Sequence, residues 1–197
     1  MSQLAENILK EAQALPEGSL LSPKLFLHLA SRAAVDQVLS RLTKEGKLMR
    51  VGRGIYVAPH QGRFGIRPPS MESVVQAIES TGEVIVANGA TEANALGLTT
   101  QVPVREVFLT SGASRKLHMG NRSIEFQHGT RWQLLLGKRQ AGRLIRALAW
   151  LGQESAPLAL QQLKKTLPES EWQAVLGARS TLPSWMSKVI SEVAVYG

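Results

Sequence analysis

The chain has 197 residues, of which 44% are hydrophobic and 19% charged, a composition that supports buried cores and excludes wholesale disorder. It contains no cysteine, which excludes disulfides, thiolate metal sites and cysteine nucleophiles and leads us to expect a cytoplasmic protein. The formal net charge is +8, and no apolar run approaches the length of about 18 residues that a transmembrane helix needs, so we expect no membrane partner.

The positive charge is concentrated in one part of the chain. Residues 22–69 carry nine Lys and Arg against Asp36 and Glu45, whereas residues 1–21 carry one Lys against three Glu. Concentrated basic charge attracts the phosphate backbone of nucleic acids and makes binding depend on salt. The alternative interpretation is that this charge only keeps the protein soluble.

The first 45 residues predict three short helices. Apolar residues recur at helical spacing over residues 2–14, and the Pro-Glu-Gly sequence at 16–18 ends this helix. Ser22-Pro23 predicts the start of a second helix. Ser31 is typical of an N-cap and predicts a third helix that ends at about Glu45.

A basic β-hairpin is predicted directly after the third helix. Residues 47–51 and 55–57 are typical of strands, and Gly52-Arg53-Gly54 predicts the turn between them. Helices followed by a basic hairpin are the order of a winged helix-turn-helix, which lays one helix in the DNA major groove. We therefore predict such a domain over residues 1–60, followed by a linker over residues 61–69.

The third predicted helix has an apolar stripe and an opposite face of small and polar residues, which can approach base edges. On that face we expect three base-reading residues: Arg32 for guanine, Gln37 for adenine, and Asp36 for a cytosine amino group. Asp36 would otherwise repel phosphate, so its alternative role is to pair with Arg32. The residues that we expect to anchor phosphates are Lys24, Arg41, Lys47, Arg50, Arg53 and Arg63.

Residues 70–197 predict a C-terminal α+β domain with a small sheet and a helical C-terminal part. The patterns indicate a helix from Ser70 to about Thr81, strands at 83–87 and 105–110, a short helix at 91–97 and a hairpin over 115–127. Helices follow at roughly 138–151, 156–166, 168–178 and 182–194. The whole chain is therefore predicted to have an α+β fold.

Few residues point to enzyme chemistry. Asp36 is the only aspartate, the four histidines lack metal-ligand spacing, and no phosphate-binding loop or nucleophile elbow is present. We therefore predict no enzyme, no metal and no cofactor. Arg139, Arg143 and Arg146 recur at helical spacing and predict either a second basic surface for an acidic partner or an ordinary solvated face.

The segment LSRLTKEGKLMRVGRGIYVAP, residues 39–59, resembles the N-terminal winged helix of AbiEi-type antitoxins, which belong to bacterial type IV toxin–antitoxin systems. Residues 84–93, 95–99 and 107–112 are similar to the strand and small-residue helix patterns of the same group.

The resemblance implies an autoregulating repressor that binds an inverted-repeat operator in double-stranded DNA. It also implies a C-terminal domain that counteracts a nucleotidyltransferase-like toxin, with no stable complex required. Carried over by position, the DNA contacts would be Ser31, Arg32, Gln37, Arg41, Lys44, Lys47, Arg50 and Arg53. Two alternatives remain open, which are a one-component regulator that responds to a ligand and a nucleic-acid-processing enzyme.

Overall fold

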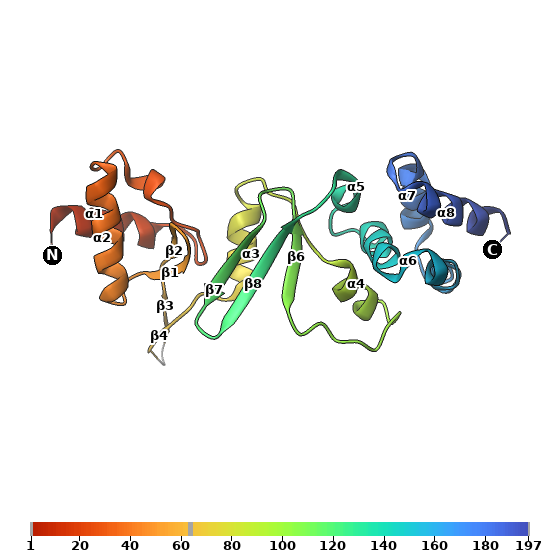
Figure 1. The fold of residues 1–197 in the computed structure, drawn as a ribbon, viewed down its shortest axis with the longest axis horizontal. Coiled ribbons are helices and arrows are strands. Elements are labelled where there is room, and N and C mark those ends of the chain that lie inside the picture. Colours follow the sequence, from red (N-terminus) through yellow and green to blue (C-terminus); the bar gives the residue numbers. More distant parts are fainter. Residues whose placement is uncertain (1, 63–64, 197) are drawn as a thin grey trace. The chain divides into compact units, whose positions relative to one another are not determined.

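The structure is a computed structural model that describes residues 2–62 and 65–196 (Figure 1). Its fold is α+β, as the sequence predicts. The chain divides into two compact units by its internal contacts. Unit 1 comprises Met1–Glu83 and Lys116–Ile124, and unit 2 comprises Val84–Arg115 and Glu125–Gly197.

Unit 1 begins with a small helical core. The helices α1 (Gln3–Ala14) and α2 (Arg32–Lys44) and the 3-10 helix η1 (Pro23–Phe26) each bury an apolar face. A short antiparallel hairpin follows, formed by β1 (Met49–Gly52) and β2 (Ile55–Val57). The buried residues of this core are Ala5, Ile8, Ala12, Leu21, Phe26, Val35, Val38, Leu39, Leu42, Leu48 and Tyr56.

Backbone hydrogen bonds hold the β1–β2 hairpin to the core. The amide of Leu21 donates to the carbonyl of Tyr56 at 2.8 Å, and the amide of Tyr56 donates back to Leu21 at 2.9 Å. Gly54 lies in the turn with φ of +67°, a conformation that a residue with a side chain adopts only with strain. The helices and the hairpin therefore occur in the order that the sequence predicts.

Two segments of unit 1 differ from the prediction. The helix expected after Ser22 is a single 3-10 turn over Pro23–Phe26, which is followed by the cap of α2 at Ser31. The expected linker contains a second hairpin, β3 (His60–Gly62) and β4 (Gly65–Arg67), in which His60 pairs with Arg67. The residues of β4 are exposed, so no apolar pattern signals this hairpin.

The helix α3 (Met71–Glu79) lies against the turn that follows α1. Its N-cap is Ser70, whose Oγ accepts a hydrogen bond from the amide of Ser73 at 3.0 Å. A Cβ atom on Gly18 would lie 2.5 Å from the carbonyl carbon of Ser73, so this close approach requires glycine. The side chain of Glu17 also accepts a hydrogen bond from the amide of Ser70, at 3.3 Å.

These contacts place α3 in unit 1, so the chain divides by contacts after Glu83. The functional boundary that the sequence places at residues 61–69 stays a prediction.

A four-stranded sheet has the strand order β5-β6-β8-β7. The strand β5 (Ile85–Ala87) pairs antiparallel with β6 (Glu106–Thr110). The strands β7 (Arg115–Met119) and β8 (Arg122–His128) are neighbours in the sheet. All four strands lie within two residues of their predicted bounds.

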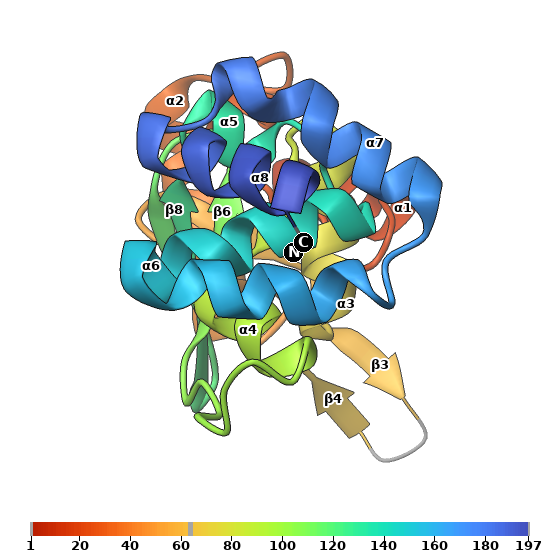
Figure 2. The ribbon, with the colours of Figure 1, turned by 90° about the vertical axis from the view of Figure 1, so that its right-hand side faces the viewer.

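The remaining helices belong to unit 2 (Figure 2). They are α4 (Gly89–Ala95), α5 (Arg131–Leu134), α6 (Gln140–Lys164), α7 (Glu169–Ala178), η2 (Arg179–Thr181) and α8 (Ser184–Tyr196). The helix α6 has non-helical dihedral angles at Gly152, so the two helices predicted for this region follow one another directly at a kink. No helix in the described ranges combines the length and apolar character needed to cross a membrane.

The core of the helical part is separate from that of α1 and α2. Figure 2 shows α6, α7 and α8 packed together. Their buried residues are Ala141, Leu144, Ile145, Leu148, Ala156, Ala159, Leu160, Trp172, Val175, Ala178, Leu182, Met186, Val189, Ile190 and Val193.

Candidate nucleic-acid interface

The helix α2 is fixed in unit 1 by one buried face. Its apolar stripe of Val35, Val38, Leu39 and Leu42 is buried in the core, which sets the rotation of the helix about its axis. The Oγ atom of Ser31 accepts a hydrogen bond from the amide of Ala34 at 3.4 Å and caps the first turn. Ser31 is therefore placed as an N-cap, at the position where the resemblance implies a DNA contact.

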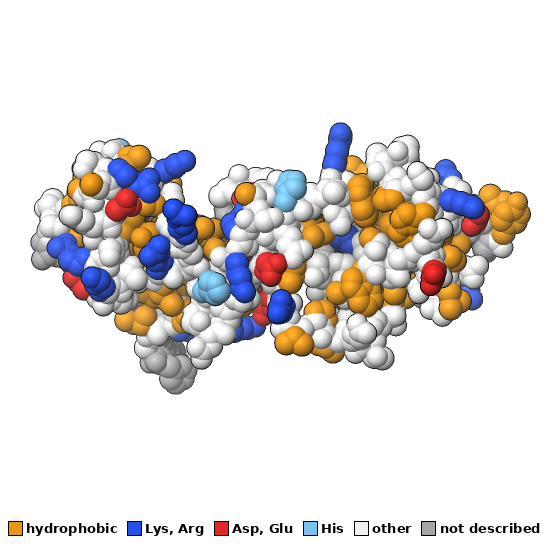
Figure 3. Space-filling view, in the orientation of Figure 1, with side chains coloured by type: hydrophobic (Ala, Val, Ile, Leu, Met, Phe, Trp, Pro, Cys, Tyr) orange, Lys and Arg blue, Asp and Glu red, His pale blue; other side chains and the backbone are white. Residues whose placement is uncertain are grey.

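The opposite face of α2 is open to solvent and shallowly hollowed. Figure 3 shows Lys and Arg side chains gathered on unit 1, where Figure 1 draws α2 and the β1–β2 hairpin. The hollow has a volume of about 490 Å³. It is lined by Asp36, Gln37, Ser40, Arg41 and Lys44. The structure therefore brings most of the helix residues predicted to contact DNA onto one accessible surface, which we call the α2 face (Arg32, Asp36, Gln37, Ser40, Arg41 and Lys44).

An ion pair lies at the N-terminal end of the α2 face. The Nε atom of Arg32 donates to Oδ2 of Asp36 at 2.9 Å, one helical turn away. The two predicted roles of Asp36 were a base contact and a pair with Arg32, and the structure contains the pair. Gln37 is exposed beside them, and no described residue forms a hydrogen bond with its side chain.

The C-terminal end of the α2 face contains a carboxylate that partly balances two predicted phosphate contacts. Oε2 of Glu45 accepts from Nζ of Lys47 at 2.8 Å, and Oε1 lies 3.8 Å from Nε of Arg41. The hydrogen bond from Lys47, followed by the charges of Lys47 and Arg41, lowers the pKa of Glu45 below its ordinary value. Arg41 also donates to Oγ of Ser2 at 3.0 Å. Sequence reasoning missed this arrangement, although Glu45 lies within four residues of both cations.

The β1–β2 hairpin carries two of the predicted phosphate contacts. Arg50 is exposed on β1, and its Nε donates to the carbonyl of Gly52 at 3.3 Å. Arg53 is exposed in the turn, and no described residue pairs with its side chain. Lys24 is exposed on η1. Arg63, the last predicted phosphate contact, lies outside the described residues.

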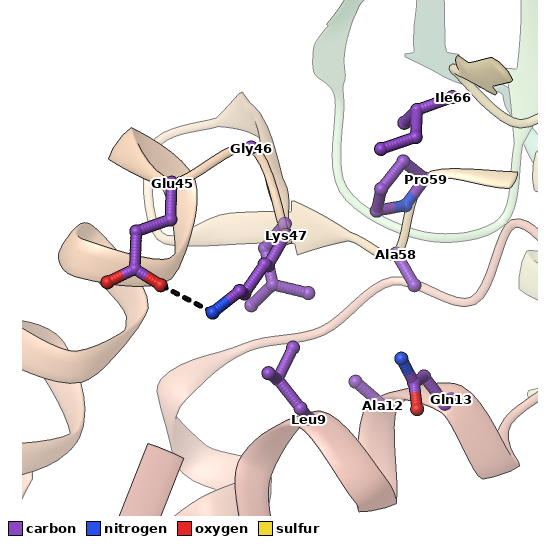
Figure 4. Close-up of a pocket in the computed structure, with 10 residues that line it drawn as sticks. Leu9, Ala12, Gln13, Glu45, Gly46, Lys47, Ala58, Pro59 and Ile66 are labelled. Atoms are coloured by element: carbon purple, nitrogen blue, oxygen red, sulfur yellow. Dashed lines mark hydrogen bonds and ion pairs between the residues drawn. The ribbon is translucent and has the colours of Figure 1, made fainter. Parts of the chain in front are cut away.

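A separate cavity of about 700 Å³ lies next to the α2–β1 turn, within unit 1 (Figure 4). Figure 4 shows the Glu45–Lys47 pair on one side of it and Leu9 of α1 on another. Most of its lining is apolar. The lining residues are Leu9, Ala12, Gln13, Glu45, Gly46, Lys47, Leu48, Ala58, Pro59 and Ile66.

The prediction of a second basic surface at Arg139, Arg143 and Arg146 is wrong for Arg146, whose side chain is 1% exposed. Its Nη2 donates to Oε1 of Glu92 at 2.8 Å, and its Nη1 donates to the carbonyls of Gln133 and Gly137.

The other two arginines of this predicted surface are paired as well. Nε of Arg143 donates to Oε2 of Glu92 at 2.8 Å, and Nη2 of Arg139 donates to Oε1 of Glu171 at 3.0 Å. The backbone amide of Ala141, followed by the Arg139 guanidinium, lowers the pKa of Glu171. Each of the three arginines is therefore paired with a carboxylate of unit 2, and only Arg146 is buried.

Sequence reasoning missed Glu92 because no local pattern marks it. It is separated from Arg146 by 54 residues and is buried on α4, where it is 4% exposed. Among the described residues, no group of three or more His, Cys, Asp or Glu side chains could hold a metal ion.

A model of the family DUF6088, described as a family of unknown function, matches residues 7–173 of the chain. No curated protein and no solved structure matches the sequence. The matched region includes the α2 face, the β1–β2 hairpin and the buried Glu92–Arg146 pair. The chain therefore belongs to the DUF6088 family.

Proposed function

We propose that this protein binds double-stranded DNA through the α2 face and the β1–β2 hairpin, as a winged helix-turn-helix, and represses transcription. The observation that carries the proposal is the α2 face itself. It is basic and solvent-exposed, while the opposite side of the same helix is buried in the core. A helix held in this way can enter a major groove without unfolding any part of unit 1.

The chemistry of the α2 face favours DNA over an apolar protein partner. The six side chains of this face are all polar or charged, and Ala33, an exposed apolar residue of the same helix, is small. A surface for protein contacts would typically present aromatic or large aliphatic anchors instead. Lys44 and Arg53 have no ionic partner among the described residues, so they can neutralise phosphates without first breaking an ion pair.

Specific recognition would combine two kinds of contact. Arg32 and Gln37 lie about 1.4 turns apart along the first part of α2, where the recognition helix of this module reads base edges. Lys44 and the hairpin residues Arg50 and Arg53 would bind phosphates and set the register. Lys47 and Arg41 would contribute less, because Glu45 competes with phosphate for both.

The biological role that we propose is that of an autoregulating antitoxin of a bacterial type IV toxin–antitoxin system, acting in the cytoplasm. This part rests on the resemblance of residues 39–59 to AbiEi-type antitoxins. Its operator would be an inverted repeat, and its functional partner would be a nucleotidyltransferase-like toxin with which it need not form a stable complex. The C-terminal domain predicted over residues 70–197 would carry the antitoxin activity.

A gel-shift assay with the chain's own upstream DNA tests the proposal. We expect a discrete shift that resists an excess of unrelated duplex competitor, and lower expression of a reporter gene placed behind the same DNA. The variant Lys44→Ala/Arg53→Ala should lose both effects, whereas Lys165→Ala/Lys188→Ala, which removes the same charge from unit 2, should keep them. The absence of any shift at low salt would refute DNA binding.

The cavity beside the α2–β1 turn favours a second candidate, a one-component regulator whose DNA affinity responds to a small molecule. Its mainly apolar lining has the size and chemistry of small-ligand sites. A ligand there would lie next to Lys47, a predicted phosphate contact. This candidate requires a compound that changes both the melting temperature and the DNA affinity, and whose effect is abolished by Ala58→Trp.

A further inference from the structure

The pair formed by Arg32 and Asp36 leaves one edge of the Arg32 guanidinium open. Arg32 is the first residue of α2, and its Nε donates to Oδ2 of Asp36 at 2.9 Å. Both side chains reach solvent, with 56% of Arg32 and 47% of Asp36 exposed. No described residue accepts a hydrogen bond from the two terminal Nη groups. Asp36 therefore restrains the Arg32 guanidinium at Nε and leaves its two terminal Nη groups available as hydrogen-bond donors.

Helix stability does not account for this pair. Exposed ion pairs one turn apart add little to stability. The helix dipole favours an acidic residue in the first turn and a basic residue later, and α2 has the reverse order here, with no acidic residue in its first turn. The pair therefore adds little to folding, and its relevance lies in its place on the exposed α2 face, where it restrains an accessible arginine.

A guanidinium restrained in this way matches the hydrogen-bond acceptors of one base. Guanine presents two acceptors, O6 and N7, at its major-groove edge, and a guanidinium can donate to both at once through its terminal N–H groups. A phosphate also accepts from arginine but does not require a fixed orientation. Asp36 keeps Oδ1 as an acceptor that could contact a cytosine amino group, but its hydrogen bond through Oδ2 ties the carboxylate to Arg32.

We infer that Asp36 is a positioning residue that holds Arg32 for the recognition of a guanine at the start of α2. The inference rests on the proposed DNA binding. It assigns specificity at one base pair to the two residues acting together, rather than to two residues that read separate bases.

Selection of preferred sites from a randomised duplex library, with the full chain, tests this inference. Asp36→Asn should lower the preference for guanine at one position by about fivefold or more. Arg32→Ala should remove the preference at the same position, and the double variant should be no less selective than Arg32→Ala alone. The matched control is Glu192→Gln, which removes the acidic partner of Lys188 from an exposed pair in the same order on α8.

The affinity for an unrelated duplex separates positioning from a structural role. Asp36→Asn removes a negative charge near the phosphates, so it should bind unrelated DNA equally well or more tightly while selecting less. A merely structural role would weaken the binding of every sequence together.

Three results would overturn the inference. The first is an unchanged guanine preference in Asp36→Asn, and the second is loss of preference at different positions in the Arg32 and Asp36 variants. In both cases the proposed DNA binding would stand. The third is failure of the wild-type chain to bind any duplex at low salt, which would overturn the proposed function as well.

Discussion

Arginines on helices have opposite environments in the two units of this molecule. On α2 of unit 1, Arg32 and Arg41 are exposed and contact carboxylates on their own helix or at its end. On α6 of unit 2, Arg143 and Arg146 share Glu92 of α4, and Arg146 is buried. Helical arginines therefore face solvent in one unit and include a buried ion-pair partner in the other.

The difference shows that the environment of the partner determines the role of a charged residue. A pair in solvent costs little to separate, so its cation can exchange a carboxylate for a phosphate. A buried pair cannot be separated cheaply, because each charge would remain desolvated without its partner. Substitutions in unit 1 should therefore change DNA binding, and those at the buried pair of unit 2 should change stability.

The largest effect is expected for Arg146→Ala. This change leaves Glu92 buried without one of its two cations and should lower the free energy of unfolding by about 3–5 kcal/mol. All four tryptophans, Trp132, Trp150, Trp172 and Trp185, lie in unit 2, so tryptophan fluorescence during urea unfolding reports on this unit. Lys188→Ala, at an exposed pair, is the control and should cost less than about 0.5 kcal/mol. An equal loss of unfolding free energy in the two variants would contradict the distinction between buried and exposed ion pairs.

Gln37→Ala should have the next largest effect, on sequence choice rather than on stability. Loss of a bidentate contact to adenine should relax discrimination at one base pair by about 1–3 kcal/mol. Site selection from a randomised duplex library measures this change, and Gln161→Ala on α6 is the matched control. If both variants return the wild-type motif, Gln37 does not read a base.

Arg53→Ala should weaken the binding of all duplexes by a similar factor. Removal of one phosphate contact should reduce the slope of log K against log salt by about one unit. Titrations at several salt concentrations measure the slope, with Arg131→Ala in unit 2 as the control. An unchanged affinity at every salt concentration would show that the hairpin turn does not contact DNA.

The smallest effect is expected for Glu45→Gln, which should tighten binding by roughly two- to fivefold because Lys47 and Arg41 no longer share a carboxylate. Since these cations lower the pKa of Glu45, its carboxylate stays charged as the pH falls through the ordinary value of 4.5 and becomes neutral only at a lower pH. The affinities of wild type and variant should therefore converge at low pH. Weaker binding by the variant would instead indicate that Glu45 orders the interface.

Local sequence signals were sufficient to predict most of the secondary structure. Ser31 and the stripe that contains Val35 and Leu42 place α2 within one residue of its bounds, because both signals act within the helix. The glycines at 52 and 54 similarly place the β1–β2 turn. These elements contain the residues that the sequence predicts to contact DNA.

Contacts between residues far apart in the chain leave no local signal in the sequence. The burial of Arg146 depends on Glu92, which lies on another helix, so helical spacing alone predicted an exposed arginine. The close approach of Gly18 to Ser73 likewise joins segments that no local pattern relates, and it places α3 in unit 1. The burial of Arg146 and the assignment of α3 to unit 1 therefore both depend on tertiary contacts.

The most direct test of DNA binding by unit 1 is a comparison of two charge-neutralised variants of the full chain in duplex binding at low salt. Lys44→Gln/Arg50→Gln/Arg53→Gln removes three cations from the α2 face and the hairpin, and Arg131→Gln/Lys165→Gln/Lys188→Gln removes three exposed cations from unit 2. We expect the first variant to lose most of its affinity and about three units of the salt slope, and the second to bind as the wild type does. Equal losses in the two variants would show that binding depends only on net charge and would contradict a DNA interface on unit 1.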